Sequence, residues 1–258
     1  RYVIAARASS IAGGAVDSYA LHIFEVNGRD VTDTTVTLTK GVNVRGRAVF
    51  EATTATPPKD MSTVTVRLTP SSTSNVAIGT TPANAAPDAT FVMPGVAPND
   101  YRVSVNVPGR TGALPTWVMK SVVAGGRDLS DVPLRVLADS GIDDLVITLT
   151  DRVTEITGLL TDAVGRPAPE FSILVFPVDR TQWGQGSRRR LPATRPASDG
   201  RYRVAGLPPG EYFMVALTEI DANEMYDVAF LESLIPAALK FALAEGEKKV
   251  QDLKLSGR

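Results

Sequence analysis

The chain has 258 residues, of which 43% are hydrophobic, 6% are aromatic and none is cysteine. Its 27 lysine and arginine residues nearly balance its 28 aspartate and glutamate residues, so no overall field draws it to nucleic acid or to an anionic membrane. The lack of cysteine excludes disulfides, thiolate metal sites and cysteine nucleophiles.

A phrase near the N-terminus returns later and divides the chain into modules. Residues 28–33 read Gly-Arg-Asp-Val-Thr-Asp, and residues 126–131 read Gly-Arg-Asp-Leu-Ser-Asp. Such self-similarity is typical of a tandem array, which favours a structural or binding role. The repeat also aligns Tyr2 with Tyr101, inside a module. We therefore expect residues 1–41 to be the C-terminal half of an incomplete β-sandwich module, which pairs with upstream polypeptide or packs against its neighbour.

This first segment contains the single histidine of the chain and an apolar run. His22 and Phe24 fall on one face of a predicted strand, which favours a packed histidine over a catalytic base. One histidine also excludes the two-histidine zinc grip of a metalloprotease. The run Val36–Leu38 is expected to form an open sheet edge, where a partner chain could add a strand.

Residues 42–150 have the pattern of a complete β-sandwich module. Val64, Val66 and Leu68 alternate with polar residues, and residues 101–107 alternate in the same way. A period of two indicates strands with one buried and one solvated face. Short strands separated by Pro, Gly, Asp and Ser are typical of a sandwich. Similar runs elsewhere in the chain are residues 44–50, 145–149, 171–178, 201–205 and 250–255.

A second repeated phrase, at residues 91–101 and 202–212, has the composition of a tight turn. Pro209 presets the first corner of a type II turn, and Gly210 supplies the positive φ of the second corner. Asn99 occupies the equivalent place in the earlier copy and is the next most tolerant residue there. The two copies are therefore expected to turn alike.

Residues 151–258 are expected to form another β-sandwich module, which carries one short helix. The helix is predicted at Val228–Leu234, where Asp227 accepts from its first amides and Pro236 blocks its continuation. It is expected to be a decoration, not a second layer. The fold class is therefore all-β, with tandem Ig-like or transthyretin-like β-sandwich modules.

Three segments of the two complete modules carry a resemblance to a known family. Residues 44–50, 156–169 and 200–212 resemble the bacterial carboxypeptidase regulatory-like domains. The resemblance implies a transthyretin-like (prealbumin-like) sandwich, similar to the noncatalytic partner of metallocarboxypeptidases. Such domains also recur in envelope proteins and at the front of outer-membrane transporters. The resemblance therefore implies a periplasmic, cell-surface or secreted location, with no catalytic residue and no cofactor.

Paired carboxylates are the remaining candidates for metal binding or catalysis. The pairs occur in predicted turns, where carboxylates can gather calcium or accept from nearby backbone amides, with Arg29 and Arg127 pairing locally. Two or three carboxylates are too few for calcium, which takes six to eight oxygen ligands. An acid-pair hydrolase would need two carboxylates about 5 to 10 Å apart across a cleft. The pairs are Asp30 with Asp33, Asp128 with Asp131, and Asp143 with Asp144.

The loop at residues 179–196 is the candidate site for partner docking. It combines a large flat ring with several guanidinium groups, which suits carboxylate, sulfate or stacked partners. Alternatively, the arginines form a solvated face and the tryptophan folds back over the sandwich as a lid. In the middle module, Trp117 has no such cluster of arginines near it in the sequence. The candidate docking residues are Trp183, Arg188, Arg189, Arg190 and Arg195.

These features favour a noncatalytic array of sandwich modules that acts as a rigid spacer or protein-contact scaffold. The short joins at residues 41–44 and 150–153 leave little slack between neighbours. Expected partners are other protein chains or upstream domains, without nucleic acid. No membrane span is predicted, because charged residues and Pro236 interrupt the apolar stretch at residues 231–244.

Two other functional classes remain open. A carbohydrate- or peptide-binding accessory module of a larger envelope enzyme or transporter would need Trp117, Trp183 and Tyr226 on one solvent face. An acid-pair hydrolase would need a carboxylate cleft.

Overall fold

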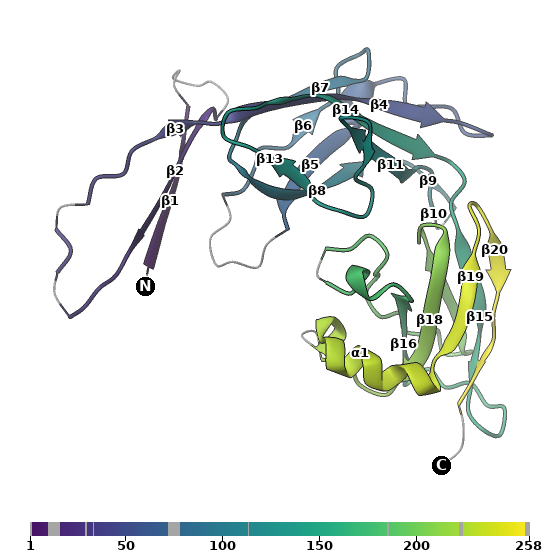
Figure 1. The fold of residues 1–258 in the computed structure, drawn as a ribbon. Helices are drawn as coiled ribbons and strands as arrows, with labels where there is room; N and C mark the ends of the chain where they lie inside the picture. The colour runs from purple at the N-terminus through teal and green to yellow at the C-terminus, as the bar shows by residue number, and fades with distance from the viewer. Residues whose placement is uncertain are drawn as a thin grey trace. The chain divides into compact units, whose positions relative to one another are not determined.

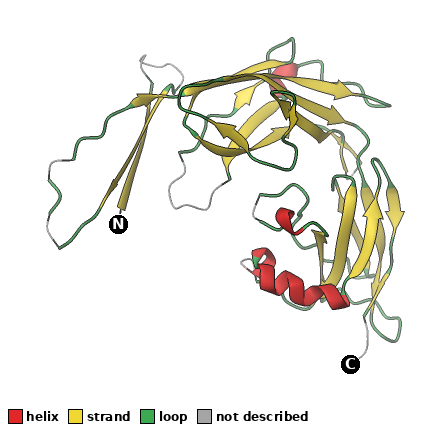
Figure 2. Ribbon diagram, in the orientation of Figure 1, coloured by secondary structure: helices red, strands yellow, loops and turns green. Residues whose placement is uncertain are grey.

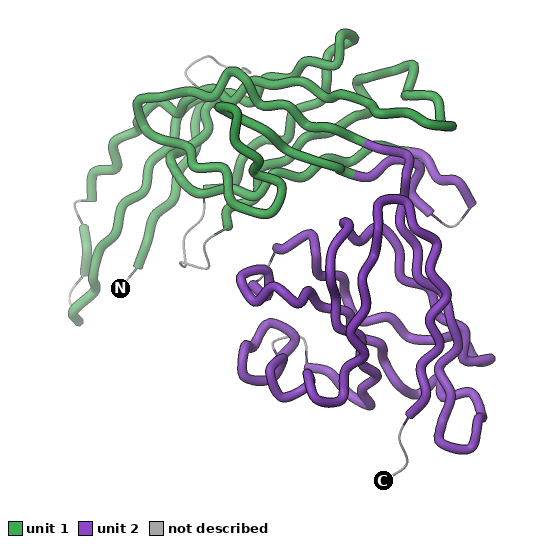
Figure 3. Tube along the Cα trace, turned by 45° about the vertical axis from the view of Figure 1, so that its right-hand side comes forward, with its two compact units in different colours: residues 1–108, 119–149 green, residues 109–118, 150–258 purple. Residues whose placement is uncertain are grey.

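The computed structural model describes residues 2–9, 16–28, 30–32, 34–71, 78–112, 114–184, 186–221 and 224–255. These residues form mainly β-strands, with one short α-helix, which confirms the predicted all-β class (Figures 1 and 2). The chain divides into two compact units (Figure 3). Unit 1 contains residues 1–108 and 119–149, and unit 2 contains residues 109–118 and 150–258. The module bounds given by the repeats remain a prediction.

Unit 1 begins with a three-stranded antiparallel sheet in the order β1-β2-β3. Strands β1 (Tyr2–Ala8) and β2 (Ser18–Phe24) pair along their whole length, from Tyr2 opposite Phe24 to Ala8 opposite Ser18. Strand β3 (Thr39–Lys40) adds only two residues to the other side of β2. The expectation of an open strand edge at Val36–Leu38 is therefore wrong. Residues 36–38 lie outside the strands, because β2 pairs with this segment only at Thr39 and Lys40.

The first sheet packs against the rest of unit 1 at a close junction. A single residue, Gly41, separates β3 from β4, and its N–H donates to Asp17 O at 2.9 Å. A Cβ on Gly41 would lie 2.3 Å from Gly95 C, and a Cβ on Gly95 would lie 2.4 Å from Val16 O. Only glycine fits this close approach of backbones at both positions.

Two sheets pack face to face in the remainder of unit 1. Five strands form one sheet in the order β12-β11-β14-β4-β7, and four form the other in the order β13-β8-β5-β6. The bounds of the first sheet are β12 (Arg127–Asp128), β11 (Val118–Ala124), β14 (Ile142–Thr150), β4 (Val42–Glu51) and β7 (Thr90–Val96). Those of the second are β13 (Leu134–Val136), β8 (Asn99–Asn106), β5 (Thr65–Pro70) and β6 (Ala83–Asn84), with the 3₁₀ turn η1 (Met61–Thr63) before β5.

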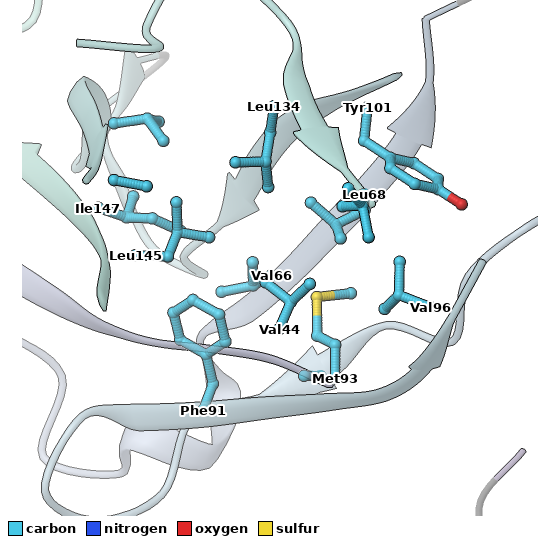
Figure 4. Packing of buried hydrophobic residues seen from close by; sticks show 14 residues of the cluster. Val44, Val66, Leu68, Phe91, Met93, Val96, Tyr101, Leu134, Leu145 and Ile147 are labelled. Carbon is cyan, nitrogen blue, oxygen red and sulfur yellow. The ribbon is translucent and has the colours of Figure 1, made fainter. Parts of the chain in front are cut away.

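The predicted alternation on β5 is confirmed. Val66 and Leu68 point inward and are buried, whereas Arg67 and Thr69 are exposed. Figure 4 shows this core, in which side chains of both sheets meet in one apolar layer. Burial on this scale is the main stabilising contribution to a sandwich of this size.

Unit 2 contains a second two-sheet sandwich with a separate core. Its first sheet has the order β17-β15-β20, with β21 also pairing with β15, and its second has the order β16-β18-β19. The strands are β15 (Glu155–Thr161), β17 (Arg201–Ala205), β20 (Lys248–Val250), β21 (Leu253–Lys254), β16 (Ser172–Pro177), β18 (Gly210–Leu217) and β19 (Leu239–Leu243). The short strands β9 (Arg110–Thr111) and β10 (Leu114–Pro115) pair with each other.

Strand β16 is covered on both faces, contrary to the expectation of one wet face. Five consecutive residues of β16, from Ile173 to Pro177, are buried. Ile173 and Val175 face the sandwich core, whereas Leu174 and Phe176 pack in a second cluster with Leu231. A run that is apolar at every position is typical of a strand buried on two sides.

Helix α1 (Val228–Leu234) supplies part of that outer layer. Its bounds and cap are as predicted, since Asp227 Oδ1 accepts from Phe230 N at 2.7 Å. Pro236 lies in the following 3₁₀ turn η4 (Ile235–Ala237). Leu231 is fully buried against the sheet, so the view of the helix as a mere decoration is wrong. Its physical role is to cover Leu174 and Phe176.

Both complete sandwiches contain the same buried tyrosine corner. Tyr101 Oη donates to Ala97 O at 2.8 Å, and Tyr212 Oη donates to Pro208 O at 2.7 Å, in each case four residues upstream. Burial raises the pKa of Tyr101 to about 12, with a smaller contribution from the nearby Tyr19.

The turns before these tyrosines share one glycine with a positive φ and differ in φ at a second position. Gly95 and Gly206, each six residues before its tyrosine, have φ values of 66° and 82°. Gly210 also has a positive φ, of 156°, whereas Asn99 does not. The prediction that Asn99 substitutes for Gly210 at a positive φ is therefore wrong. The glycine that both turns require is the earlier one.

Among the described residues, every helix is too short or too polar to cross a bilayer.

Candidate functional site

The candidate docking loop follows β16 and begins with a capped 3₁₀ turn. Asp179 Oδ1 accepts from Thr181 N at 3.0 Å and so starts η2 (Arg180–Gln182). Trp183 comes next and is only 1% exposed. Its Nε1 donates to Pro177 O at 2.7 Å, and its ring meets the Phe176 ring edge-on, with centroids 5.8 Å apart.

The burial of Trp183 decides between the two interpretations of its ring. Because Trp183 packs with Phe176 and Leu231 on the outer face of the sheet, it folds back as a lid. The expectation that it offers a flat ring to a stacked partner is therefore wrong. The physical reason is that β16 has an apolar outer face that needs a cover.

Arg190 is a buried side chain that holds the end of the loop through hydrogen bonds. It is 8% exposed, and its Nη1 donates to Trp183 O at 2.7 Å. Its Nη2 donates to Met225 O, and its guanidinium lies 4.8 Å from the centroid of the Tyr226 ring. Burial lowers the pKa of Arg190. These contacts fasten the loop to the turn η3 (Glu224–Tyr226) and assign Arg190 to packing.

Arg189 is half-buried and ties the loop to the tyrosine corner of unit 2. Its Nη1 donates to Pro209 O at 2.7 Å and lies 3.4 Å from Tyr212 Oη. A Cβ on Gly210 would lie 2.6 Å from the same Nη1 atom. The arginine and the turn are therefore fitted to each other, which sequence spacing alone does not reveal.

Arg188 is half-buried and Arg195 is exposed, so of the five candidates Arg195 presents most to solvent. Partner docking at this loop stays a prediction. The structure adds Arg180, whose Nη1 lies 2.8 Å from Glu232 Oε1 and whose guanidinium lies 5.7 Å from the Trp183 centroid. This pair is not predictable from local sequence, because Glu232 belongs to helix α1, far along the chain.

Asp128 accepts a local hydrogen bond as predicted, but the expectation of a turn at Asp143 and Asp144 is wrong, because both lie in strand β14 and contact remote residues. Asp128 Oδ1 accepts from Ser130 N at 2.8 Å, and Asp144 Oδ2 accepts from Gly125 N at 2.7 Å. Asp143 pairs with Arg45 at 2.6 Å. In the part of the chain that the structure describes, no group of three or more His, Cys, Asp or Glu could hold a metal ion. Of the first pair, Asp30 is exposed; Asp33 and Arg29 lie outside the described residues.

One cavity of about 560 Å³ in unit 1 contains carboxylates from three positions, Asp100, Asp143 and Asp144. Asp100 binds Arg135 in a two-point contact, at 3.0 Å to Nε and 3.3 Å to Nη2. The other two are engaged by Arg45 and by the Gly125 amide. Carboxylates held in this way are poor candidates for the acid pair of a hydrolase, which needs one free nucleophile or base.

The aromatic residues do not form the expected binding platform. Trp117 is 5% exposed and Trp183 is 1% exposed, so neither ring lies on a solvent face. Tyr226 is half-buried and is covered by the guanidinium of Arg190. His22 stacks on Phe24 with centroids 6.2 Å apart, which confirms its predicted place on that face. The aromatic signature of a sugar-binding module is therefore missing at the predicted residues.

No family model matches the chain, and no curated protein matches its sequence. Several solved structures are similar in part. The Bacillus anthracis TIE protein is 9% identical with a TM-score of 0.28, over 93% of this chain and 41% of that protein. A streptococcal ancillary pilin is 13% identical with a TM-score of 0.29, over 97% of this chain and 74% of the pilin.

The minor pilin GBS52 of Streptococcus agalactiae is 12% identical with a TM-score of 0.32, over 82% of this chain and 94% of the pilin. The chain thus spans about two fifths of the length of the TIE protein and most of the length of the two pilins. The low TM-scores mean that the backbones superpose only partly.

Proposed function

We propose that the chain is a noncatalytic array of β-sandwich modules of the carboxypeptidase regulatory-like type, with modules at residues 1–41, 42–150 and 151–258. It acts as a rigid spacer or protein-contact scaffold in a bacterial protein of the envelope, cell surface or extracellular space. Two continuous cores, one in each unit, supply the stiffness that a spacer needs.

The observation that carries the proposal is the short join at residues 151–152, which follows β14 and precedes residues that are held within unit 2. Val153 is 5% exposed, and its carbonyl accepts from Lys248 Nζ at 2.8 Å. Thr154 is 3% exposed, its Oγ1 donates to Leu207 O at 2.5 Å, and its carbonyl accepts from Gly206 N at 3.0 Å. A Gly/Ser linker has none of these contacts and behaves as a random coil. These contacts lie within unit 2 and leave only residues 151 and 152 between β14 and the second core, and so short a join favours fixed spacing.

The proposal is tested by a distance measurement between the units. The chain contains no cysteine, so Lys59→Cys with Val164→Cys places one spin label on each unit. Pulsed electron–electron double resonance then gives the distribution of distances between the two spin labels. We expect a narrow distribution that widens about twofold when Gly-Ser-Gly-Ser is inserted after Asp151, because the insert replaces a fixed join with coil.

The control carries the same four residues between Gly125 and Gly126, an exposed turn away from the join. That variant is expected to keep the narrow distribution. If the unmodified chain already has a distribution as wide as the Asp151 insertion, rigid spacing is refuted.

A further inference from the structure

We propose that the outer face of the sheet β13-β8-β5-β6 binds an extended acidic segment of a partner polypeptide, whose carboxylates pair with Arg67 and Arg102. The inference rests on the protein-contact role proposed above and deepens it, because it names the contacting surface and the chemistry of the partner. All four strands belong to unit 1.

Strand alternation places the two arginines on the outer face of the sheet. Leu68 of β5 and Tyr101 of β8 are buried in the core of unit 1, as Figure 4 shows. Because successive side chains of a strand point to opposite faces, Arg67 and Arg102 point away from that core. In the antiparallel register of β5 with β8, Arg67 lies opposite Ser104, which is two residues beyond Arg102. The two arginines are therefore diagonal neighbours on one face.

The corresponding sheet of unit 2 has a different outer face. Strands β8 and β18 each contain a corner tyrosine, and they pair with β5 and β16. The outer face of β16 is apolar, and Trp183 and helix α1 cover it. On β5 the outward side chains of Arg67 and Thr69 are exposed, so the described part of unit 1 leaves this face open to solvent. A polar and basic face suits a charged partner and not an apolar lid.

Arg67 is a cation without a partner in the described part of the chain. Its side chain is exposed and makes neither an ion pair nor a hydrogen bond there. The strand arginines Arg45 and Arg135 each bind an aspartate instead. An arginine presents its N–H donors in a rigid fork that matches the two oxygens of a carboxylate. Arg67 is therefore available to a carboxylate from outside the chain.

Arg102 is a half-buried cation that is weakly compensated. Its Nε is buried without a hydrogen-bond partner, and its Nη1 donates to Asp131 O at 3.5 Å. Burial lowers the pKa of Arg102, and the nearby charge of Asp131 raises it by a smaller amount. A charged donor that is partly removed from water is unfavourable until an acceptor binds it, so this guanidinium also favours a carboxylate.

Hydroxyl groups accompany both arginines on the same face. Ser104 lies opposite Arg67, and Thr69 lies opposite Arg102. Both hydroxyl side chains are exposed, and a hydroxyl donates one hydrogen bond. Each arginine and the hydroxyl that faces it can therefore bind the two oxygens of one carboxylate.

The acidic residues near this row leave it with an excess of positive charge. Asp100 is held by Arg135 in a two-point contact, at 3.0 and 3.3 Å. Asp131 is the second acid, and it stands against both Arg67 and Arg102. Such a face attracts an acidic partner and repels a basic one.

The spacing of the two arginines favours an extended partner. Diagonal neighbours of an antiparallel pair lie about 7–8 Å apart. In an extended segment every second side chain points to the same face, and these side chains are about 6.5–7 Å apart. A segment with acidic residues at alternate positions therefore brings one carboxylate to each arginine.

The test uses the whole chain and two fluorescent peptides of equal composition. Thr-Glu-Thr-Glu-Thr-Glu-Thr has all of its acidic side chains on one face when it is extended, whereas Thr-Thr-Glu-Glu-Glu-Thr-Thr divides them between two faces. Fluorescence anisotropy measures the binding of each peptide. We expect the alternating peptide to bind at least about threefold more tightly, and its affinity to fall as salt is added. Equal binding of the two peptides, or no binding of either, would overturn the proposal.

Three substitutions assign the binding to this face. Arg67→Ala is expected to weaken binding of the alternating peptide by about fivefold to tenfold. Arg102→Lys keeps the charge of a half-buried residue but removes its fork, and it is expected to weaken binding by about threefold. Arg47→Ala is the matched control, because Arg47 is an exposed arginine of β4 in the other sheet. The proposal is wrong if Arg67→Ala binds like the unmodified chain, or if Arg47→Ala weakens binding to the same extent.

Amide NMR shifts locate the bound peptide, and we expect the largest shifts at Arg67, Thr69, Arg102 and Ser104. Shifts confined to other strands would contradict the assignment. An acidic polysaccharide is the competing occupant: if polygalacturonate binds through Arg67 and neither peptide binds, it replaces the polypeptide. The outcome is separate from that of the spacer test, because this face lies within unit 1, whereas the spin labels report the distance between the units.

Discussion

Tyr101 and Tyr212 make the same hydrogen bond in the two sandwiches. Each ring is fully buried, and each hydroxyl donates to the carbonyl four residues upstream. The sequence repeat aligned these residues correctly, because the phrase around them is nearly constant in spacing. It could not predict that Asn99 lacks the positive φ of Gly210, since side-chain identity does not fix φ when another glycine, Gly95, already makes the turn.

We expect Tyr212→Phe to lower the free energy of unfolding of unit 2 by about 1–3 kcal/mol, because Pro208 O would remain buried without its donor. The matched control is Tyr2→Phe, since Tyr2 is 58% exposed and exposed substitutions change stability by about 0.5 kcal/mol or less. Urea unfolding followed by tryptophan fluorescence reports unit 2, which contains both tryptophans, and hydrogen exchange with mass spectrometry reports the amides of unit 1. Equal losses for the two variants would show that the corner hydrogen bond contributes nothing specific.

Single strands and helices are predictable where the sequence has one clear hydrophobic period or a capping residue. The strand at residues 201–205 and the helix Val228–Leu234 have the predicted bounds, because each has clear periodicity or caps. The run at 250–255 instead divides into β20 and β21, with Asp252 Oδ1 accepting from Leu159 N between them at 2.8 Å. The second buried face of β16 was missed because its cover comes from the remote helix α1.

The junction between β3 and β4 gives a prediction at this scale. We expect Gly41→Ala to destabilise unit 1 by about 1–3 kcal/mol, because the new Cβ would meet the Gly95 backbone at 2.3–2.7 Å. Gly79→Ala is the control, since the nearest atom there is Arg7 Nη1 at 4.0 Å. Its stability should stay the same or rise slightly through a less flexible unfolded chain. Thermal unfolding measures both variants, and an unchanged Gly41→Ala midpoint would contradict the tight junction.

For the whole molecule, the sequence predicts the fold class better than the residues that could bind a partner. Repeated phrases and alternating strands indicated tandem sandwiches, and the structure contains two separate sandwich cores. Composition marks the arginines of the loop as docking candidates, but it does not distinguish an exposed arginine such as Arg195 from a buried one such as Arg190. That distinction depends on which remote backbone groups accept the guanidinium. Strand pairing at β1 was equally hidden, because it depends on contacts between segments and not on local pattern.

The two cores predict two separable unfolding events. Leu160 is fully buried in the core of unit 2, and Leu145 is fully buried in the core of unit 1. We expect Leu160→Ala to lower the stability of unit 2 by about 2–5 kcal/mol while the transition of unit 1 is unchanged, because each side chain packs within its own core. Leu145→Ala is the reciprocal control. Hydrogen exchange with mass spectrometry assigns each loss to its unit. If either substitution accelerated exchange equally in both cores, the chain would unfold as one cooperative body and not as two modules.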